Sequence, residues 1–170
     1  MGGAIATSFV LSGSRNVRGL LLSGAALKPG RDVSALTLAL TPLLNKLTPK
    51  MKALNLDINY VSRNPDIVAA KKLDPLIDHR KIPVRTAAEL LKTIKKIQAN
   101  MERLTVPLLI MHGTEDKWTN LDGSKELYQR SRSQDKTLKL YEGFCHELLS
   151  DVERLRVQTG IVGWISSRLG

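Results

Sequence analysis

The sequence is poor in cysteine and in long apolar runs, and each shortage argues against a class of protein. Cys145 is the single cysteine among 170 residues. No disulfide can therefore form within the chain, and we expect a reducing, cytoplasmic compartment. The apolar run 17–27 is interrupted by Arg18 and is too short to span a bilayer. The first residues also lack the basic stretch that opens a secretory signal.

Motifs for metal, nucleotide and nucleic-acid binding are missing as well. No His, Cys and carboxylate cluster has the spacing of metal ligands, and no glycine-rich loop suits a nucleotide, so we expect neither metal nor cofactor. Aromatic residues make up 4% of the chain, and no helix-turn-helix, zinc-finger or RNA-binding pattern occurs. We therefore expect no nucleic-acid partner. The net charge of +10 then indicates either a solvated surface or attraction to anionic lipid.

What the sequence does contain is the alternation of strands and helices that is typical of an α/β protein with a parallel sheet. Hydrophobic residues make up 42% and charged residues 25%, as in a soluble domain. Continuous apolar runs at 20–25 and 106–112 predict buried strands, and the alternating stretch 137–142 predicts a third. Helices are expected over residues 1–14 and about 121–132.

Two capping boxes predict the starts of two more helices. The first box is Thr86 with Glu89. Its helix would present an inward apolar stripe made of Leu90, Ile94, Ile97, Met101 and Leu104. The second box is Ser150 with Glu153. Its helix would face inward with Val152, Leu155, Thr159, Val162 and Ile165.

Residues 28–84 break this alternation, since they hold six of the seven prolines. We expect an insertion of short helices over the carboxyl edge of the sheet. Its leucine-rich stretch 36–44 has two interpretations: packing onto the main domain, or a mobile lid that lines an acyl-chain pocket.

Two loops carry residues suited to catalysis, and each follows a predicted strand. Asp116 lies in the loop after the strand 106–112, and His146 lies in the loop after the strand 137–142. Ligands bind beyond the carboxyl ends of parallel strands, so both loops should emerge at one edge of the sheet. There the acid could hydrogen-bond one ring nitrogen and stabilise the imidazolium formed when the other takes a proton. Taken alone, a loop Asp and a lone His are more often structural.

The amino terminus adds a third feature. A nucleophile elbow has the form Gly-x-Ser-x-Gly, with the serine on a strained turn between a strand and a helix. Met1-Gly2 would supply the last two residues of that pattern, which would put the serine just before Met1. The order serine, acid, histidine then matches the order in α/β-hydrolases.

With these features the chain resembles the monoacylglycerol lipase branch of the α/β-hydrolases, also described as lysophospholipases or serine aminopeptidases of the S33 type. The matching stretches are 1–6 (Met-Gly-Gly-Ala-Ile-Ala), 62–68 (Ser-Arg-Asn-Pro-Asp-Ile-Val), 74–79 (Asp-Pro-Leu-Ile-Asp-His), 106–116 (Val-Pro-Leu-Leu-Ile-Met-His-Gly-Thr-Glu-Asp) and 139–147 (Lys-Leu-Tyr-Glu-Gly-Phe-Cys-His-Glu). The resemblance covers nearly the whole chain, and residues 28–84 fall where that family inserts its cap. It implies Asp116 as the triad acid and His146 as the general base. The fold it implies is a partial α/β-hydrolase, residues 1–170, with its amino-terminal part missing and a helical cap.

The sequence departs from the family at the nucleophile. No serine has glycine at both the second position before it and the second after it, and the candidates considered are Ser8, Ser12, Ser14 and Ser23. One oxyanion-hole donor would be the backbone N–H of Met1, but only in a longer chain. The simplest account is a partial chain that lacks roughly a hundred upstream residues, which would leave an unpaired sheet edge and favour self-association.

Other candidate residues fit less well. Glu115 adjoins Asp116 and could compete as the acid, although the family pattern places the acid at 116. His112 and His79 match family positions without a catalytic role, and we interpret both as structural. Cys145 adjoins His146, but no helix amino terminus lowers the pKa of its thiol.

These features predict a serine ester hydrolase that acts on a lipophilic ester, a monoacylglycerol or a lysophospholipid, with possible peripheral membrane contact through the cap. Two alternatives stay open. One is a catalytically inactive remnant that acts only as a binding or scaffold protein. The other, within the same fold, is a peptidase or thioesterase.

Overall fold

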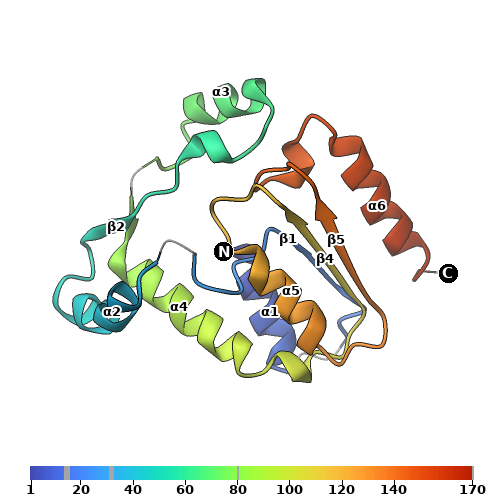
Figure 1. Ribbon diagram of the computed structural model, residues 1–170, viewed down its shortest axis with the longest axis horizontal. Helices are drawn as coiled ribbons and strands as arrows, with labels where there is room; N and C mark the ends of the chain where they lie inside the picture. Colours follow the sequence, from blue (N-terminus) through green and yellow to red (C-terminus); the bar gives the residue numbers. More distant parts are fainter. Residues whose placement is uncertain (14–15, 31–32, 80, 170) are drawn as a thin grey trace.

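A sheet of three parallel strands in the order β1-β4-β5 forms the centre of the structure (Figure 1). This computed structural model describes residues 1–13, 16–30, 33–79 and 81–169. The strands are β1 (Leu20–Ser23), β4 (Leu108–Gly113) and β5 (Lys136–Tyr141). The predicted α/β class is therefore confirmed, and each predicted strand is present with slightly shifted ends.

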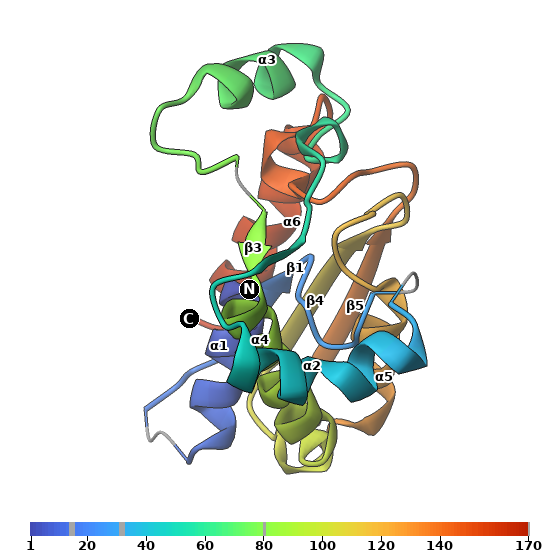
Figure 2. The same ribbon diagram turned by 90° about the vertical axis from the view of Figure 1, so that its left-hand side faces the viewer.

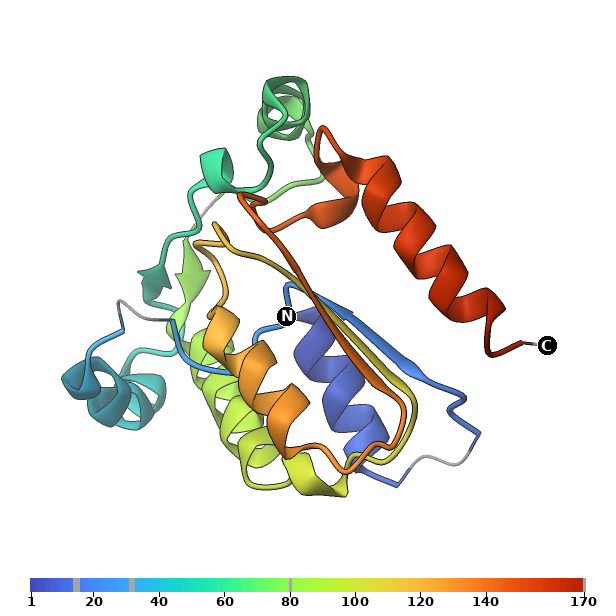
Figure 3. The ribbon, with the colours of Figure 1, turned by 45° about the vertical axis from the view of Figure 1, so that its right-hand side comes forward.

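Helices cover both faces of the sheet (Figure 3). One face carries α1 (Gly2–Leu11), α4 (Val84–Gln98) and α5 (Leu121–Arg130), and the other carries α6 (Arg154–Ser166). Leu108 and Ile110 of β4 pack in the core with α1, α4 and α5, whereas Leu109 and Met111 pack with α6. Successive strand residues point to opposite faces. Because both faces are covered, every residue of β4 is buried, which explains its continuous apolar run.

The amino-terminal end of α4 differs from the prediction. The helix begins at Val84 after Pro83, so Thr86 lies inside it and caps nothing. The backbone N–H groups of Val84 and Arg85 donate to the carbonyls of Met51 and Pro49, at 2.8 and 3.1 Å. Tertiary backbone contacts thus satisfy the first two N–H donors of the helix, which begins two residues before the expected capping box. The predicted stripe faces inward, since Ile94, Ile97, Met101 and Leu104 are at most 2% exposed. The single helix expected to carry it is shorter, however: α4 ends at Gln98, and Met101 starts the 3-10 helix η2 (Met101–Arg103).

The inward face of α6 was predicted wrongly. Leu155 and Val162 are 71% and 60% exposed, whereas Val157 and Trp164 are buried. Glu153 precedes the helix without a side-chain cap bond, and the hydroxyl of Ser150 donates to Glu147 instead of capping. The Trp164 indole decides which face turns inward, since it packs so closely on Gly19 that a Cβ there would lie 2.9 Å from the ring.

Segment 28–84 leaves the sheet after β1 and returns to it through α4 (Figure 2). It contains α2 (Ala35–Leu47), β2 (Lys52–Leu54), the short 3-10 helix η1 (Ile58–Tyr60), α3 (Pro65–Leu73) and β3 (Ile82–Pro83). The antiparallel pairing of β2 with β3 was not predicted.

The leucines of α2 do not pack as the first interpretation had it. Leu36, Leu40, Leu43 and Leu47 are between 43% and 67% exposed. Their spacing of four, three and four residues places them along one side of the helix. The packing interpretation is therefore wrong for this row. Within the described residues, no helix is long and apolar enough to cross a membrane.

Candidate active site

Asp116 and His146 meet at the carboxyl edge of the sheet. The loops that carry them follow β4 and β5, which are neighbours in register, with Gly113 opposite Tyr141. The Nδ1–H of His146 donates to Oδ2 of Asp116 over 2.8 Å. A carboxylate can only accept, so this contact assigns the proton to Nδ1 and leaves Nε2 as the ring nitrogen available for proton transfer.

Three further donors hold the Asp116 carboxylate from its own loop. The backbone N–H groups of Trp118 and Thr119 donate to Oδ1 at 2.8 and 2.9 Å, and the Thr119 hydroxyl donates to Oδ2 at 2.7 Å. Bonds from an Asp side chain to backbone two and three residues onward are typical of an Asx turn. Thr119 was not predicted as a site residue, although the Asp-x-x-Thr spacing from Asp116 was a signal in the sequence that could have indicated it.

A second, fully buried histidine lies behind the same carboxylate. His112 is 0% exposed, and its Nε2 lies 3.3 Å from Oδ2 of Asp116. Its Nδ1 lies 2.7 Å from the Ser124 hydroxyl. These partners are consistent with a tautomer in which Ser124 donates to Nδ1 and Nε2–H points to Asp116. His112 thus contacts the candidate acid from behind, in a position that could hold the carboxylate in place.

The Asp116 carboxylate stays ionised although its side chain is 0% exposed. Burial by itself raises the pKa of this group, but hydrogen bonds from His112, His146 and Thr119 and the proximity of His146 outweigh it. The pKa is therefore held well below its usual range. A charged acid here can orient His146 and stabilise it when protonated.

Neighbouring groups fix the His146 ring. Its centroid lies 5.0 Å from the Trp118 ring, and the side chain is 19% exposed. Gly24, just after β1, has a φ of +54°, and a Cβ there would lie 3.0 Å from the His146 Nδ1. Glycine is thus required at this position by both its backbone angle and the close approach.

The amino end of α1 lies at the same edge of the sheet. A Cβ on Gly3 would come within 2.6 Å of the Ala25 Cβ, so this glycine permits close packing of the helix start on the turn after β1. Burial lowers the pKa of the Met1 amino group, and the charge of Asp116 acts in the opposite direction. The chain terminus thus lies within electrostatic reach of the Asp116 carboxylate.

The competing candidates lie elsewhere or have other partners. Glu115 is half-exposed and pairs with Lys117 over 3.2 Å. Burial raises the pKa of the Cys145 thiol, which disfavours the thiolate. His79 is exposed. The serines considered are Ser8 on α1, Ser12 just after it, Ser23 at the end of β1, and Ser14, which lies outside the described residues.

No metal site is evident in the part of the chain that the structure describes, since no three His, Cys, Asp or Glu side chains gather there as ligands would. Two surface hollows of about 180 and 390 Å³ lie beside α1. Neither is lined by Asp116 or His146.

The chain is similar to known proteins in both sequence and structure. The family profile described as "Serine aminopeptidase, S33" matches residues 1–153. The chain is 35% identical over 169 residues to a monoacylglycerol lipase of Mycolicibacterium smegmatis, and 33% identical over 172 residues to a monoglyceride lipase of Rattus norvegicus. Both alignments cover 99% of this chain, but they cover 60% and 57% of those relatives. The crystal structure of the Paleococcus ferrophilus monoacylglycerol lipase superposes with a TM-score of 0.88 at 28% identity, over 98% of this chain and 65% of that one.

The charge of Asp116 should stabilise the fold in a pH-dependent way. Since its folded pKa lies below the unfolded value of about 3.9, its contribution is complete above that value and declines as the pH falls from there toward the folded pKa. We expect Asp116→Asn to lower the free energy of unfolding by roughly 2 kcal/mol at pH 7. The difference from the parent should shrink by about 1 kcal/mol between pH 5 and pH 3, as measured by urea unfolding.

Glu115→Gln is the matched control for this measurement, because it removes the same charge from the adjacent, half-exposed position. It should change stability by less than about 0.5 kcal/mol. A constant difference between Asp116→Asn and the parent from pH 7 to pH 3 would contradict the expected depression of the Asp116 pKa.

Proposed function

The chain belongs to the serine aminopeptidase S33 family of α/β-hydrolases, and we propose that it carries the acid and the general base of a serine ester hydrolase of the monoacylglycerol lipase type. The observation that carries the proposal is the 2.8 Å hydrogen bond between His146 Nδ1 and Asp116 Oδ2 at the carboxyl edge of the sheet. The lipase relatives support a lipophilic acyl ester as the substrate.

In the proposed reaction a serine hydroxyl attacks the acyl carbonyl while Nε2 of His146 accepts the hydroxyl proton. The imidazolium, stabilised by Asp116, then gives this proton to the departing alcohol, which leaves an acyl ester on the serine. Water activated by His146 attacks that ester in turn. The serine is released and a fatty acid is formed.

We place the nucleophilic serine immediately before the residue that is Met1 here. The close contact between Gly3 and Ala25 and the position of the Met1 amino group near Asp116 support this placement. In such a chain the N–H of Met1 would be a peptide amide and could donate to the oxyanion. The competing hypothesis is an inactive binding or scaffold protein, which the lack of a Gly-x-Ser-x-Gly pattern favours for the 170 residues alone.

A chimera tests this placement. The part of the M. smegmatis lipase that precedes its matched region is joined in front of Met1, with serine or alanine at the junction. We expect a fluorophosphonate probe to label the serine form at least a hundredfold faster than the alanine form. His146→Gln in the serine form should remove most of the labelling, and Asp116→Asn should reduce it strongly but to a smaller extent, because the acid acts through the histidine.

The 170-residue chain without the added part serves as the control and should not be labelled. Labelling of one of its own serines would overturn the proposed nucleophile position, and an unreactive serine chimera that is folded would favour the inactive alternative. Turnover of monooleoylglycerol, a lysophospholipid, an acyl thioester and a peptide anilide by the chimera separates lipase, thioesterase and peptidase activity.

We propose segment 28–84 as the cap of this hydrolase. Its middle part contacts both candidate catalytic loops: the Trp118 indole N–H donates to the Asp57 carbonyl at 3.0 Å, and the Glu147 N–H donates to the Val61 carbonyl at 2.8 Å. A segment bound there covers the carboxyl edge of the sheet, where a substrate would enter.

The exposed row on α2 supports a role for this cap in reaching lipid. Leu36, Leu40, Leu43 and Leu47 form an apolar strip, and Lys46, Lys50 and Lys52 lie on the same helix or just after it. Apolar side chains beside cations are suited to a surface of anionic lipid, to which each adjacent lysine adds about 1 kcal/mol. We therefore propose a cytoplasmic protein that contacts membranes peripherally through α2.

Vesicle flotation tests the membrane contact. We expect binding to vesicles of phosphatidylcholine mixed with phosphatidylglycerol, weaker binding to phosphatidylcholine alone, and loss of binding at high salt. The pair Leu36→Glu and Leu43→Glu should weaken binding by about tenfold or more, because two leucines lose their burial in lipid. The same exchange at Leu73 and Leu76, which are exposed outside the row, is the matched control. Equal loss in both pairs would exclude α2 as the contact surface.

The free side of β1 favours self-association of this chain. In the described residues β1 pairs with β4 alone, so its other side offers unpaired backbone groups. We propose that two copies associate through this edge. Sedimentation velocity should show dimers or larger species whose share rises with concentration, and Leu21→Pro should reduce them by removing an N–H from the strand. A concentration-independent monomer would contradict the proposal.

A further inference from the structure

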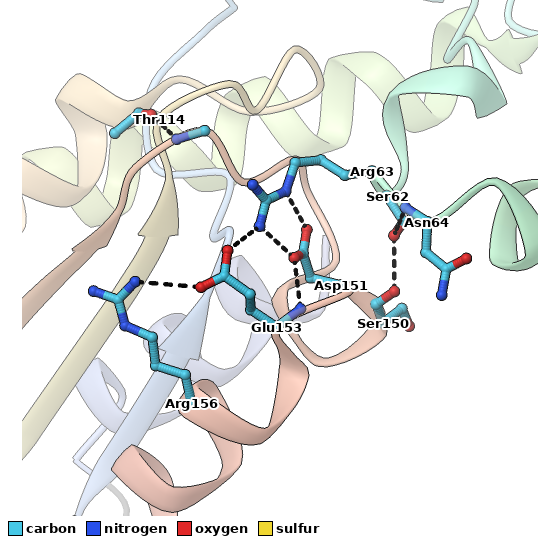
Figure 4. Close-up of polar contacts among 9 residues, drawn as sticks. Ser62, Arg63, Asn64, Thr114, Ser150, Asp151, Glu153 and Arg156 are labelled. Carbon is cyan, nitrogen blue, oxygen red and sulfur yellow. Dashed lines mark hydrogen bonds and ion pairs between the residues drawn. The ribbon is translucent and has the colours of Figure 1, made fainter.

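Arg63 lies where segment 28–84 meets the loop of His146 (Figure 4). Its guanidinium forms a two-pronged bond to the Asp151 carboxylate, from Nε at 2.9 Å and from Nη2 at 2.6 Å. Nη2 also donates to Glu153 at 2.9 Å. The Asp151 side chain is only 1% exposed, so its charge depends on this partner. Neither acid has a part in the proposed reaction.

The same guanidinium reaches the opposite end of the loop. Its carbon lies 4.2 Å from the centroid of the Phe144 ring, which is fully buried. Phe144 stands two residues before His146, and Asp151 stands five residues after it. Arg63 therefore contacts the His146 loop, residues 144–151, on both sides of the histidine. We call this set of contacts the Arg63 clamp.

Backbone contacts run alongside this clamp. The Glu147 N–H donates to the Val61 carbonyl at 2.8 Å, and the Ser62 hydroxyl donates to the Ser150 carbonyl at 2.7 Å. Residues 61–63 thus lie against residues 144–151. Among the described contacts, the fork of Arg63 joins both ends of the loop with one rigid group.

The charges in this cluster are mutually dependent. Burial by itself raises the pKa of Asp151, but the hydrogen bonds and the charge of Arg63 lower it below its usual range. If Arg63 were lost, a buried carboxylate would be left without its cation, which is strongly unfavourable. Two changes would relieve this: protonation of Asp151, or movement of the loop until Asp151 reached water, in which case His146 would move with it.

We propose that Arg63 is a positioning residue that sets His146 against Asp116 through Asp151 and Phe144, so that docking of the cap and alignment of the general base are one event. The proposal rests on the proposed function for its catalytic meaning. The effect of Arg63 on the position of His146 can be measured without any turnover, because the bond between His146 and Asp116 is present in the chain itself.

Proton NMR of the 170-residue chain tests whether Arg63 positions His146. The Nδ1 proton of His146 sits in a charge-assisted bond and should give a slowly exchanging low-field resonance, assigned by its absence in His146→Gln. We expect Arg63→Met to speed its exchange with water by about tenfold or more. Arg63→Lys should do so to a smaller extent, since lysine keeps the charge but lacks the planar fork and the stacking. Asp151→Asn, which preserves shape and leaves no buried charge but loses the ion pair, should speed exchange less than Arg63→Met.

Two controls separate positioning from general loosening. Glu153→Gln touches the same guanidinium from a half-exposed position and should change the exchange rate by less than about twofold. The ring proton of buried His112 should be unaffected in every variant. Unchanged exchange at His146 in folded Arg63→Lys and Asp151→Asn would overturn the proposal, and so would equal acceleration at His112.

The serine chimera gives the catalytic readout. Arg63→Met should lower kcat about tenfold or more while KM changes by less than about twofold, because the histidine is displaced and the acyl site is not. A reactive chimera whose kcat is insensitive to Arg63 would overturn the clamp and leave the proposed function intact. An unreactive parent chimera would instead count against the proposed function, and the NMR exchange rates would still decide the clamp.

Discussion

The buried negative charge of Asp116 is the constraint on which the rest of this structure depends. An ionised carboxylate out of contact with water needs donors on all its lone pairs. The loop after β4 supplies backbone donors and a hydroxyl, and His112 and His146 supply ring N–H groups. The parallel register of β4 and β5 brings His146 to this charge, and the same register would allow the pair to act in proton transfer.

Segment 28–84 is structurally continuous with this site. Its residues 57–63 bind the loops of both Asp116 and His146 through backbone carbonyls, and Arg63 adds charged contacts. If this segment acts as the proposed cap, these contacts would let it influence the proposed chemistry as well as the entry of substrate. The exposed leucine row on α2 lies elsewhere on the same segment, where it could meet a lipid surface without disturbing the histidine.

The accuracy of the sequence predictions follows the range of the interactions involved. The strand 108–113 was recognised because burial on both faces leaves a continuous apolar run. Both capping boxes were wrong because the groups involved have other partners, some of them distant in the chain, such as Arg63 on Glu153. Met51 and Pro49 accept from the first residues of α4, and Ser150 bonds Glu147 instead of capping α6. The α6 face was wrong because packing of Trp164 on Gly19 outweighs the local pattern of leucine and valine.

The sequence by itself determined the α/β class, the family and the two loops that hold Asp116 and His146, because strand periodicity and loop motifs are encoded in short windows of residues. Only the tertiary structure decided that His112 and Thr119 contact the Asp116 carboxylate, that the α2 leucines face outward, and that Arg63 binds the loop of His146. Arg63 and Asp151 are 88 positions apart. Contacts of this kind depend on how whole elements pack, and no local pattern in the chain specifies that packing.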